Sequence, residues 1–137
     1  MALRPERKDA GSNPQLRLRC VRLADRAAIS ATALRFARRL GFDERASWEI
    51  GISVQELASN MIRHAGGGYL EIDVGEHWLE ILATDAGPGI PEVKLKESET
   101  STRGLGAIRR LMHELEVSAL ASGGARVRAR RYMDRKR

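Results

Sequence analysis

The sequence predicts an α+β protein, a two-layer sandwich in which a mostly antiparallel β-sheet carries helices on one face. Several short runs alternate apolar and polar residues with a period of two, which is typical of strands with one buried face. Between residues 25 and 65, apolar residues instead recur every three or four positions, which is typical of amphipathic helices. Because the later strands follow one another in runs, we expect antiparallel pairing, with the helices covering one side of the sheet.

Chain length and composition indicate one domain. The 137 residues are enough to bury a core without disulfides or metals. We divide them into a flexible N-terminal arm (1–14), a single domain (15–133) and a basic C-terminal tail (134–137). The one cysteine, Cys20, excludes an internal disulfide and fits a small buried hydrophobe in a cytoplasmic protein. No apolar run is long enough to span a membrane, and residues 1–15 lack the core of a signal peptide.

The chain is basic, with a net charge of +6, but much of the excess lies at its two ends. Aromatic residues make up only 4% of the chain, which argues against a stacking platform for nucleic acid. In the last predicted strand Arg126, Arg128 and Arg130 alternate with small residues and are expected to face water or a partner. No nucleic-acid reader motif accompanies them, so we predict neither a nucleic-acid nor a membrane partner.

The first half of the chain is predicted to form one strand and two helices. The strand covers Gln15 to Leu23, where apolar residues alternate with arginines. Asp25 is the expected cap of a helix that runs to Leu40 and ends at Gly41. The second helix runs from an Asp43 cap to about His64 and is stopped by residues 65–68. His64 lies at its end, where a helix dipole partner is expected.

The second half is predicted to form a hairpin, a third helix and two strands. The two glycines at 104 and 106 open that helix, which we extend through Leu115. A polar loop with weak patterning precedes it, and Gly123 and Gly124 separate the last strands. The predicted ranges are 69–74 and 77–83 for the hairpin around Gly75-Glu76, 93–102 for the loop, and 116–120 and 125–133 for the last strands.

Glu56 and Asn60 form the first candidate site. They are four residues apart on the second helix and so lie on one face, one turn from each other. An amide oxygen is a neutral ligand for a hard cation, and a nearby carboxylate can orient or deprotonate a hydroxyl. The pair therefore suits a metal-phosphate site, although on spacing alone two side chains that simply face solvent are the favoured explanation, by roughly three to one.

Two glycine-bearing segments later in the chain are candidates for binding the ligand on which this pair would act. In the first, Gly87 and Gly89 allow backbone to approach a flat ligand closely, and Asp85 can accept a hydrogen bond from an exocyclic amine such as that of adenine. In the second, Gly104 and Gly106 at a helix start would present backbone N–H groups to phosphate. Each segment alone is a weak signal, but their order after Asn60 is a strong one.

The motifs resemble those of the GHKL superfamily, the Bergerat-fold ATPases and kinases. Residues 56–60 match its N-box, residues 85–90 its first glycine box and residues 102–107 its second. Within the superfamily, residues 63–68 and 110–115 look like the bacterial anti-sigma-factor serine kinases, and most like the RsbT-type switch kinases of the stressosome. The resemblance covers about Leu16 to Tyr132.

The resemblance implies a role for each matching residue. Asn60 would ligate Mg²⁺ that bridges the phosphates of ATP or ADP, and Glu56 would be the catalytic base toward a serine or threonine hydroxyl. Asp85 would bind the adenine amine. The other implied nucleotide-binding residues shape the adenine pocket or form a lid over the phosphates: Gly87, Gly89, Ile90, Ser101, Thr102, Arg103, Gly104, Leu105 and Gly106.

The resemblance also implies partners for a serine/threonine kinase. The acceptor would be a STAS-domain protein of the RsbS or RsbR type, and further partners would be an RsbU-like phosphatase or a sigma factor, with a homodimer as a further possibility. The alternative is a non-catalytic nucleotide-binding module that sequesters a sigma factor or activates a phosphatase by binding. Glu56 favours catalysis, whereas Thr102, at a position where relatives have glycine, and the shortened second box favour binding alone. Gly124-Ala125 also departs from the Gly-Thr of many relatives.

Overall fold

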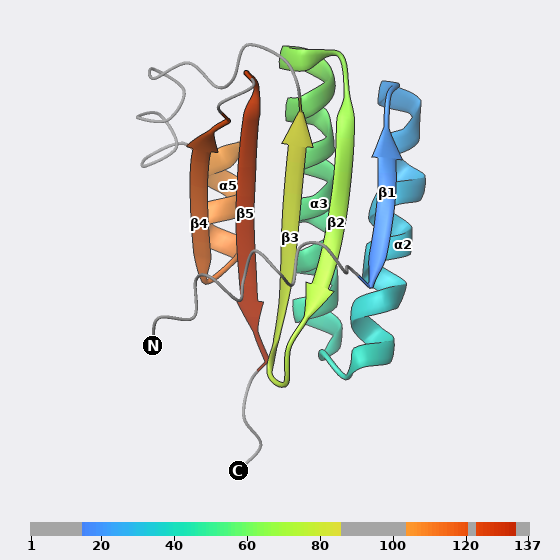
Figure 1. Cartoon of the computed structure of the whole chain (residues 1–137). Helices are drawn as coiled ribbons and strands as arrows, with labels where there is room; N and C mark the ends of the chain where they lie inside the picture. Colours follow the sequence, from blue (N-terminus) through green and yellow to red (C-terminus); the bar gives the residue numbers. More distant parts are fainter. Residues whose placement is uncertain (1–14, 86–103, 121–122, 134–137) are drawn as a thin grey trace.

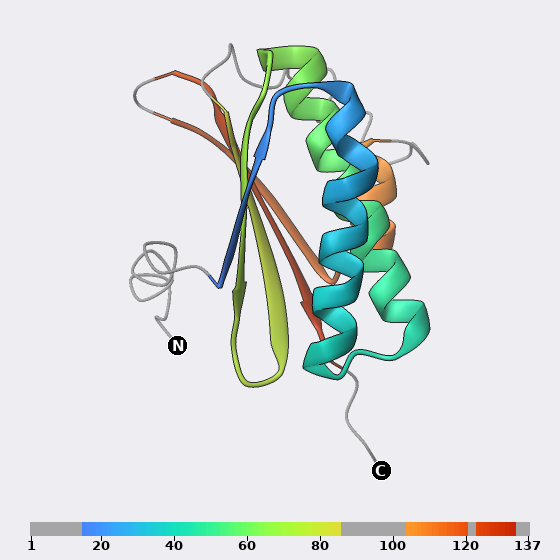
Figure 2. The same cartoon turned by 90° about the vertical axis from the view of Figure 1, so that its right-hand side faces the viewer.

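In the computed structural model, which describes residues 15–85, 104–120 and 123–133, a single antiparallel sheet carries the helices on one face (Figures 1 and 2). Its five strands lie in the order β1-β2-β3-β5-β4. The predicted α+β two-layer sandwich is therefore confirmed, while the predicted arm and tail lie outside the described residues. The elements are β1 (Leu16–Cys20), the 3-10 helix η1 (Leu23–Asp25), α2 (Arg26–Leu40), α3 (Glu44–Ala65), β2 (Gly68–Val74), β3 (Trp78–Asp85), α5 (Leu105–Leu111), β4 (Glu114–Ala119) and β5 (Ala125–Tyr132).

The chain turns from β1 into α2 through η1, which the sequence did not predict. The Asp25 carboxylate accepts hydrogen bonds from the backbone N–H groups of Arg22 (3.0 Å) and Val21 (3.3 Å). Asp25 is the N-cap residue of α2, as predicted, but its side chain makes no hydrogen bond to the amides of that helix. The two backbone N–H groups lower the pKa of Asp25, because they stabilise its charged form.

The α2–α3 connection follows the predicted capping chemistry. Gly41 adopts a φ of 110°, which favours glycine, and its N–H bonds the carbonyls of Ala37 and Arg38. Two residues later the Asp43 carboxylate accepts a hydrogen bond of 2.7 Å from the Ala46 N–H, as an N-cap does. The short connection between them holds the two helices against each other as a hairpin (Figure 2).

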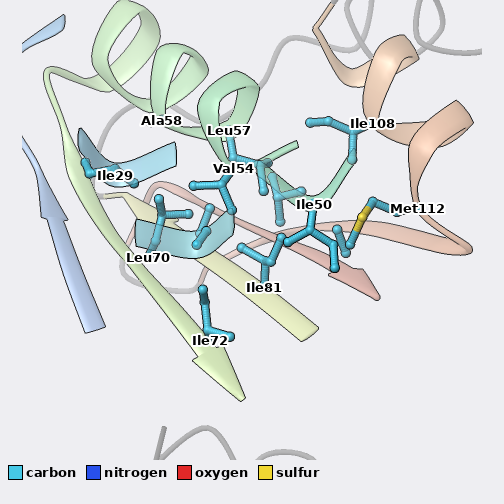
Figure 3. Packing of buried hydrophobic residues seen from close by; sticks show 14 of the residues in the cluster. Ile29, Ile50, Val54, Leu57, Ala58, Leu70, Ile72, Ile81, Ile108 and Met112 are labelled. Carbon is cyan, nitrogen blue, oxygen red and sulfur yellow. The ribbon is translucent and has the colours of Figure 1, made fainter. Parts of the chain in front are cut away.

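Helix α3 supplies the centre of the core. Ile50, Val54 and Leu57 point from it toward the sheet, where Leu70 and Ile81 lie (Figure 3). All five are at most 1% exposed. Burial of such side chains contributes roughly 1.5–3 kcal/mol each, so this interface fixes the rotation of α3 about its own axis. No helix in the part of the chain that the structure describes has an apolar stretch fit to cross a membrane.

The glycines after α3 end the helix and let β2 enter the sheet. Gly66 ends α3 with a φ of 76°. A Cβ on Gly67 would lie 2.5 Å from the Cys20 carbonyl oxygen, and a Cβ on Gly68 would lie 2.3 Å from that of Thr84. Both positions need glycine because the neighbouring strands β1 and β3 come too close for a side chain.

Several element boundaries differ from the predictions: β1 ends at Cys20 rather than Leu23, and β4 begins at Glu114 rather than Glu116. The N–H of Gly75 bonds the Trp78 carbonyl at 2.9 Å, so the tip of the β2–β3 hairpin is residues 76–77. Helix α5 ends at Leu111, because the next residue is already extended, and Leu115 pairs with Ala129 in the sheet. Leu115 lies four residues after Leu111, so its position fits a helical stripe as well as an inward-facing strand residue.

The arginines of β5 do not form a free row on the outer face of the sheet. The guanidinium of Arg130 donates to the Glu80 carboxylate at 2.8 and 3.0 Å, and Arg128 donates to the same oxygen at 3.0 Å. Arg128 also pairs with Glu114 and Glu116, and these carboxylates raise its pKa although burial opposes the charge. The expectation that this row faces water or a partner is wrong for Arg130, which is 5% exposed.

Candidate functional site

The second half of α3 presents Glu56 and Asn60. Their side chains are half-buried and one turn apart, while Leu57, Ala58 and Met61 between and beyond them are buried in the core. These anchors direct the Glu56–Asn60 face away from the sheet interior. Within the described residues, the Glu56 carboxylate takes part in no hydrogen bond or ion pair. It therefore has the capacity to accept a proton or a hydrogen bond from a substrate group.

Asp85 lies at the end of β3, between the first residues of β2 and β5. It pairs with Gly68 across the sheet, and its Oδ1 accepts a hydrogen bond of 3.3 Å from the N–H of Ala125. This bond joins two segments that are 40 residues apart in sequence. The carboxylate is half-buried, where a hydrogen bond to a ligand amine would be worth more than in water.

Gly104 brings the start of α5 to Asn60. Its φ of 56° and ψ of −128° are suited to glycine, and a Cβ at this position would lie 4.0 Å from the Asn60 Oδ1. The next two residues, Leu105 and Gly106, are buried, and Leu105 packs in the core. The backbone at the start of α5 therefore faces the amide of the N-box without an intervening side chain.

These three segments come together at one end of the sheet. The second half of α3, the last residue of β3 and the first residues of α5 all lie at the end where β3 finishes (Figure 1). Of the predicted site residues, the structure describes Glu56, Asn60, Asp85, Gly104, Leu105 and Gly106. The other predicted site residues, Gly87, Gly89, Ile90, Ser101, Thr102 and Arg103, lie outside the described residues and stay predictions.

Sequence reasoning missed one contact beside the site. Arg26, in the first turn of α2, donates from Nη1 to the Ser59 Oγ at 3.2 Å. Ser59 is 4% exposed and directly precedes Asn60. The bond ties α2 to the N-box from the side opposite α5. Its partners are 33 residues apart, and no local spacing could have indicated it.

The described residues fit a metal that arrives with a phosphorylated ligand rather than a metal held by the protein alone. In the ranges that the structure covers, no group of three or more His, Cys, Asp or Glu side chains could hold a metal ion. Asn60 offers one amide oxygen. Mg²⁺ keeps several waters and takes one or two protein ligands together with phosphate oxygens, so a single Asn is compatible with it.

Comparisons with known proteins identify the family. Residues 21–131 match the family described as "Histidine kinase-like ATPase domain". The serine/threonine-protein kinase RsbT of Bacillus subtilis (strain 168) is 32% identical over 127 residues, which cover 83% of this chain and 96% of RsbT.

Two solved structures share the fold. The SiaB-SiaC complex of Pseudomonas aeruginosa matches with a TM-score of 0.61 at 14% identity, over 97% of this chain and 99% of that one. The histidine kinase domain of the Erythrobacter litoralis EL346 kinase matches with a TM-score of 0.55 at 19% identity, over 81% of this chain, which spans 60% of its length. The chain belongs to the histidine kinase-like ATPase family and is a homologue of RsbT.

Proposed function

We propose that this chain is an ATP-dependent serine/threonine-protein kinase. The observation that carries the proposal is the placement of the Glu56 carboxylate and the Asn60 amide on one face of α3, opposite Gly104 and at the same end of the sheet as Asp85. A nucleotide site needs a base-binding group, a metal ligand and a phosphate-facing backbone, and these three segments offer them. The homologue RsbT carries the name serine/threonine-protein kinase, which supports the same reaction class.

Each residue has a defined task in this proposal. Bound ATP with Mg²⁺ supplies the phosphoryl group, which passes to the acceptor oxygen while ADP leaves. Asp85 accepts a hydrogen bond from the adenine amine and so sets the orientation of the nucleotide. Asn60 contributes its amide oxygen to the metal. Glu56 orients the serine or threonine hydroxyl and takes its proton as the new bond to oxygen forms.

The proposed acceptor is a STAS-domain protein of the RsbS or RsbR type. Homology to RsbT supports this choice, and a partner-switching role with an RsbU-like phosphatase or a sigma factor follows from it. A chain of the SiaB-SiaC complex shares the fold, so a chain of this architecture occurs in a complex with another protein. We propose a stress or sigma-factor pathway as the setting of the partner exchange.

A non-catalytic nucleotide-binding module is the second candidate. One sequence feature favours it, namely Thr102 at the position where the second glycine box of the superfamily has its first glycine. Such a module would act by holding a sigma factor or a phosphatase, and ATP would serve only as a conformational ligand.

The Glu56→Gln variant separates the two candidates. The amide keeps the shape of the side chain but cannot take a proton, so we expect nucleotide affinity to persist while phosphoryl transfer slows by roughly 10²–10⁴-fold. The measurements are single-turnover transfer from labelled ATP to a purified STAS-domain protein of the RsbS type and an equilibrium titration with ADP.

Glu71→Gln is the matched control, because this carboxylate pairs with Arg17 on the outer face of the sheet. It should change neither quantity. Equal transfer rates in wild type and Glu56→Gln would remove Glu56 as the base. No transfer by the wild type to any STAS-domain protein would favour the binding module.

A further inference from the structure

Helix α3 carries two exposed apolar side chains that do not pack in the core. Trp48 is 53% exposed and Ile52 is 42% exposed, whereas Ile50, Val54 and Leu57 of the same helix are at most 1% exposed. The two exposed residues are one turn apart and therefore share a face. A single exposed leucine-sized side chain is ordinary on a protein surface, but a tryptophan and an isoleucine side by side form a contact patch.

The Trp48 side chain is held in place before any partner arrives. Its indole N–H donates to the Glu44 carboxylate at 3.0 Å. The same carboxylate forms an ion pair with the guanidinium of Arg38 on α2. The Arg38 bond lowers the pKa of Glu44, so this carboxylate stays charged. An ordered tryptophan loses little conformational entropy on binding, and Trp and Arg are the residues that most often dominate the binding energy of interfaces.

The helix layer that carries Trp48 and Ile52 has a net positive charge as a whole, although Arg38 and Arg45 are each paired with a glutamate. Helices α2, α3 and α5 together carry eight arginines and three glutamates. Glu44 pairs with Arg38, and Glu49 pairs with Arg45 and Arg131, so only Glu56 among the glutamates of these helices makes no ion pair within the described residues. A protein that covers the patch would gain from carboxylates around its own apolar contact.

The patch lies in line with the proposed catalytic base. Trp48, Ile52 and Glu56 are spaced at four-residue intervals along α3, so Ile52 is one turn from Glu56 and Trp48 is two turns away. At 1.5 Å per residue these separations are about 6 and 12 Å along the axis. A protein that rests on Trp48 and Ile52 can therefore reach Glu56 with a side chain.

We infer that Trp48 and Ile52, together with Arg38 and Arg45, form the docking surface for the phosphoacceptor protein. The acceptor presents an apolar patch surrounded by carboxylates and places its serine or threonine one to two turns farther along α3, at Glu56. This inference rests on the proposed kinase function for the identity of the occupant. The docking itself needs no catalysis and is measurable without nucleotide.

The test measures binding of a purified STAS-domain protein of the RsbS type by calorimetry, with full-length variants and no nucleotide. Trp48→Ala is expected to raise Kd at least about 10-fold, and Ile52→Ala somewhat less. Leu23→Ala is the matched control, because Leu23 is 43% exposed in η1 and lies outside the patch. It should leave Kd unchanged. ADP titrations should give equal affinity for all these chains, since none of the substituted residues belongs to the nucleotide site.

The charge part of the inference has its own pair of variants. Arg45→Glu adds a negative charge beside Trp48, whereas Arg63→Glu adds one at the far end of the same helix. Only the first should weaken acceptor binding several-fold, and added salt should weaken wild-type binding. Equal effects of the two reversals would overturn the assignment of an acidic partner.

The outcomes separate docking from catalysis. Weaker binding of Trp48→Ala supports the docking surface even if the wild type transfers no phosphoryl group, a result that would count against the kinase alone. Transfer with unchanged Kd and KM in Trp48→Ala overturns the docking surface and leaves the kinase standing. A wild type that does not bind the STAS-domain protein overturns the inference. Sedimentation completes the test: if Trp48→Ala converts a wild-type dimer to a monomer without changing acceptor affinity, a second copy is the occupant and the inference fails.

Discussion

At the scale of a single residue, Asp85 makes one observed contact and is assigned a second one in the proposal. Its Oδ1 holds the first N–H of β5, and the proposal assigns the carboxylate a hydrogen bond from the adenine amine as well. These two contacts can be separated because an asparagine keeps an acceptor oxygen for Ala125 but turns the other oxygen into a donor. A donor facing the adenine amine would leave two donors opposed.

We therefore predict that Asp85→Asn folds but binds ADP at least about 10-fold more weakly, as expected for a buried hydrogen bond worth roughly 1–3 kcal/mol. Calorimetry with ADP measures the loss, and urea unfolding checks that stability is retained. Equal ADP affinity in the variant and the wild type would exclude Asp85 from the site.

Cys20 is confirmed as a small buried hydrophobe, since it is fully buried on the inner side of β1. Burial, and to a smaller extent the charge of Asp25, raises the pKa of its thiol from 9.0 to about 11. The folded state thus keeps the proton at a pH where the unfolded chain has lost it. This difference stabilises the fold below pH 9 relative to higher pH, and the stabilisation is lost as the pH rises through about 11.

The predicted pH dependence is testable with Cys20→Ala. Between pH 9 and 11 the wild type should lose on the order of 2 kcal/mol of unfolding free energy more than the variant, which has no thiol to ionise. Denaturant unfolding across this range gives both curves. Parallel curves would show that the thiol does not titrate differently in the two states.

At the scale of elements, the sequence predicted best where the chemistry is local. The Asp43 cap, the apolar face of α3 and the Gly66 stop all act within a few residues of one another, and all three are confirmed. Leu115 was assigned to the wrong element because its spacing fits both periods, and only the pairing with Ala129 decides for the strand. Local pattern sets an element's type more firmly than its boundary.

Contacts between distant residues account for what the sequence could not predict. Arg130 alternates with small residues in the pattern of a solvent-facing side chain, yet it is buried because Glu80, 50 residues earlier, lies opposite it and Trp78 stacks on its guanidinium at 3.9 Å. The same holds for Arg26 and Ser59 beside the site. Among the site residues, motif order alone indicated that Asn60 and Gly104 meet, and the structure brings them together.

At the scale of elements, the prediction concerns Gly68, the first residue of β2. A Cβ on Gly68 would meet the Thr84 carbonyl oxygen at 2.3 Å and the Met61 sulfur at 2.9 Å, so the backbone of the β2–β3 ladder would have to shift. Gly68→Ala should therefore reduce the free energy of unfolding by about 3 kcal/mol. Urea unfolding measures the change.

Gly66→Ala is its matched control, because nothing lies within 4 Å of a Cβ there and only the φ of 76° opposes alanine. That strain costs about 1 kcal/mol. If the two substitutions destabilise the chain equally, close approach of the strands is not the reason for the glycine at position 68.

At the scale of the whole molecule, the proposed nucleotide site draws residues from both layers. In the proposal the helix layer contributes Glu56, Asn60 and Gly104, and the sheet contributes Asp85 at the end of β3, beside β5. A ligand that contacts both layers binds the folded chain and not the unfolded one. Such a ligand raises the free energy of unfolding by RT ln(1 + [L]/Kd), which is about 1.4 kcal/mol for each tenfold increase above Kd.

The last prediction uses this linkage to test Asn60. With Mg²⁺ present, ADP should raise the midpoint of thermal unfolding of the wild type in proportion to the logarithm of its concentration. Asn60→Ala removes one metal ligand and should lower this gain, whereas in excess chelator the two proteins should respond to ADP alike, because Asn60 then has no metal to hold. Differential scanning fluorimetry over a series of ADP concentrations measures all four responses. An equal loss in Asn60→Ala with and without Mg²⁺ would mean that the amide contacts the nucleotide directly or shapes the pocket, and the metal role assigned to it would be wrong.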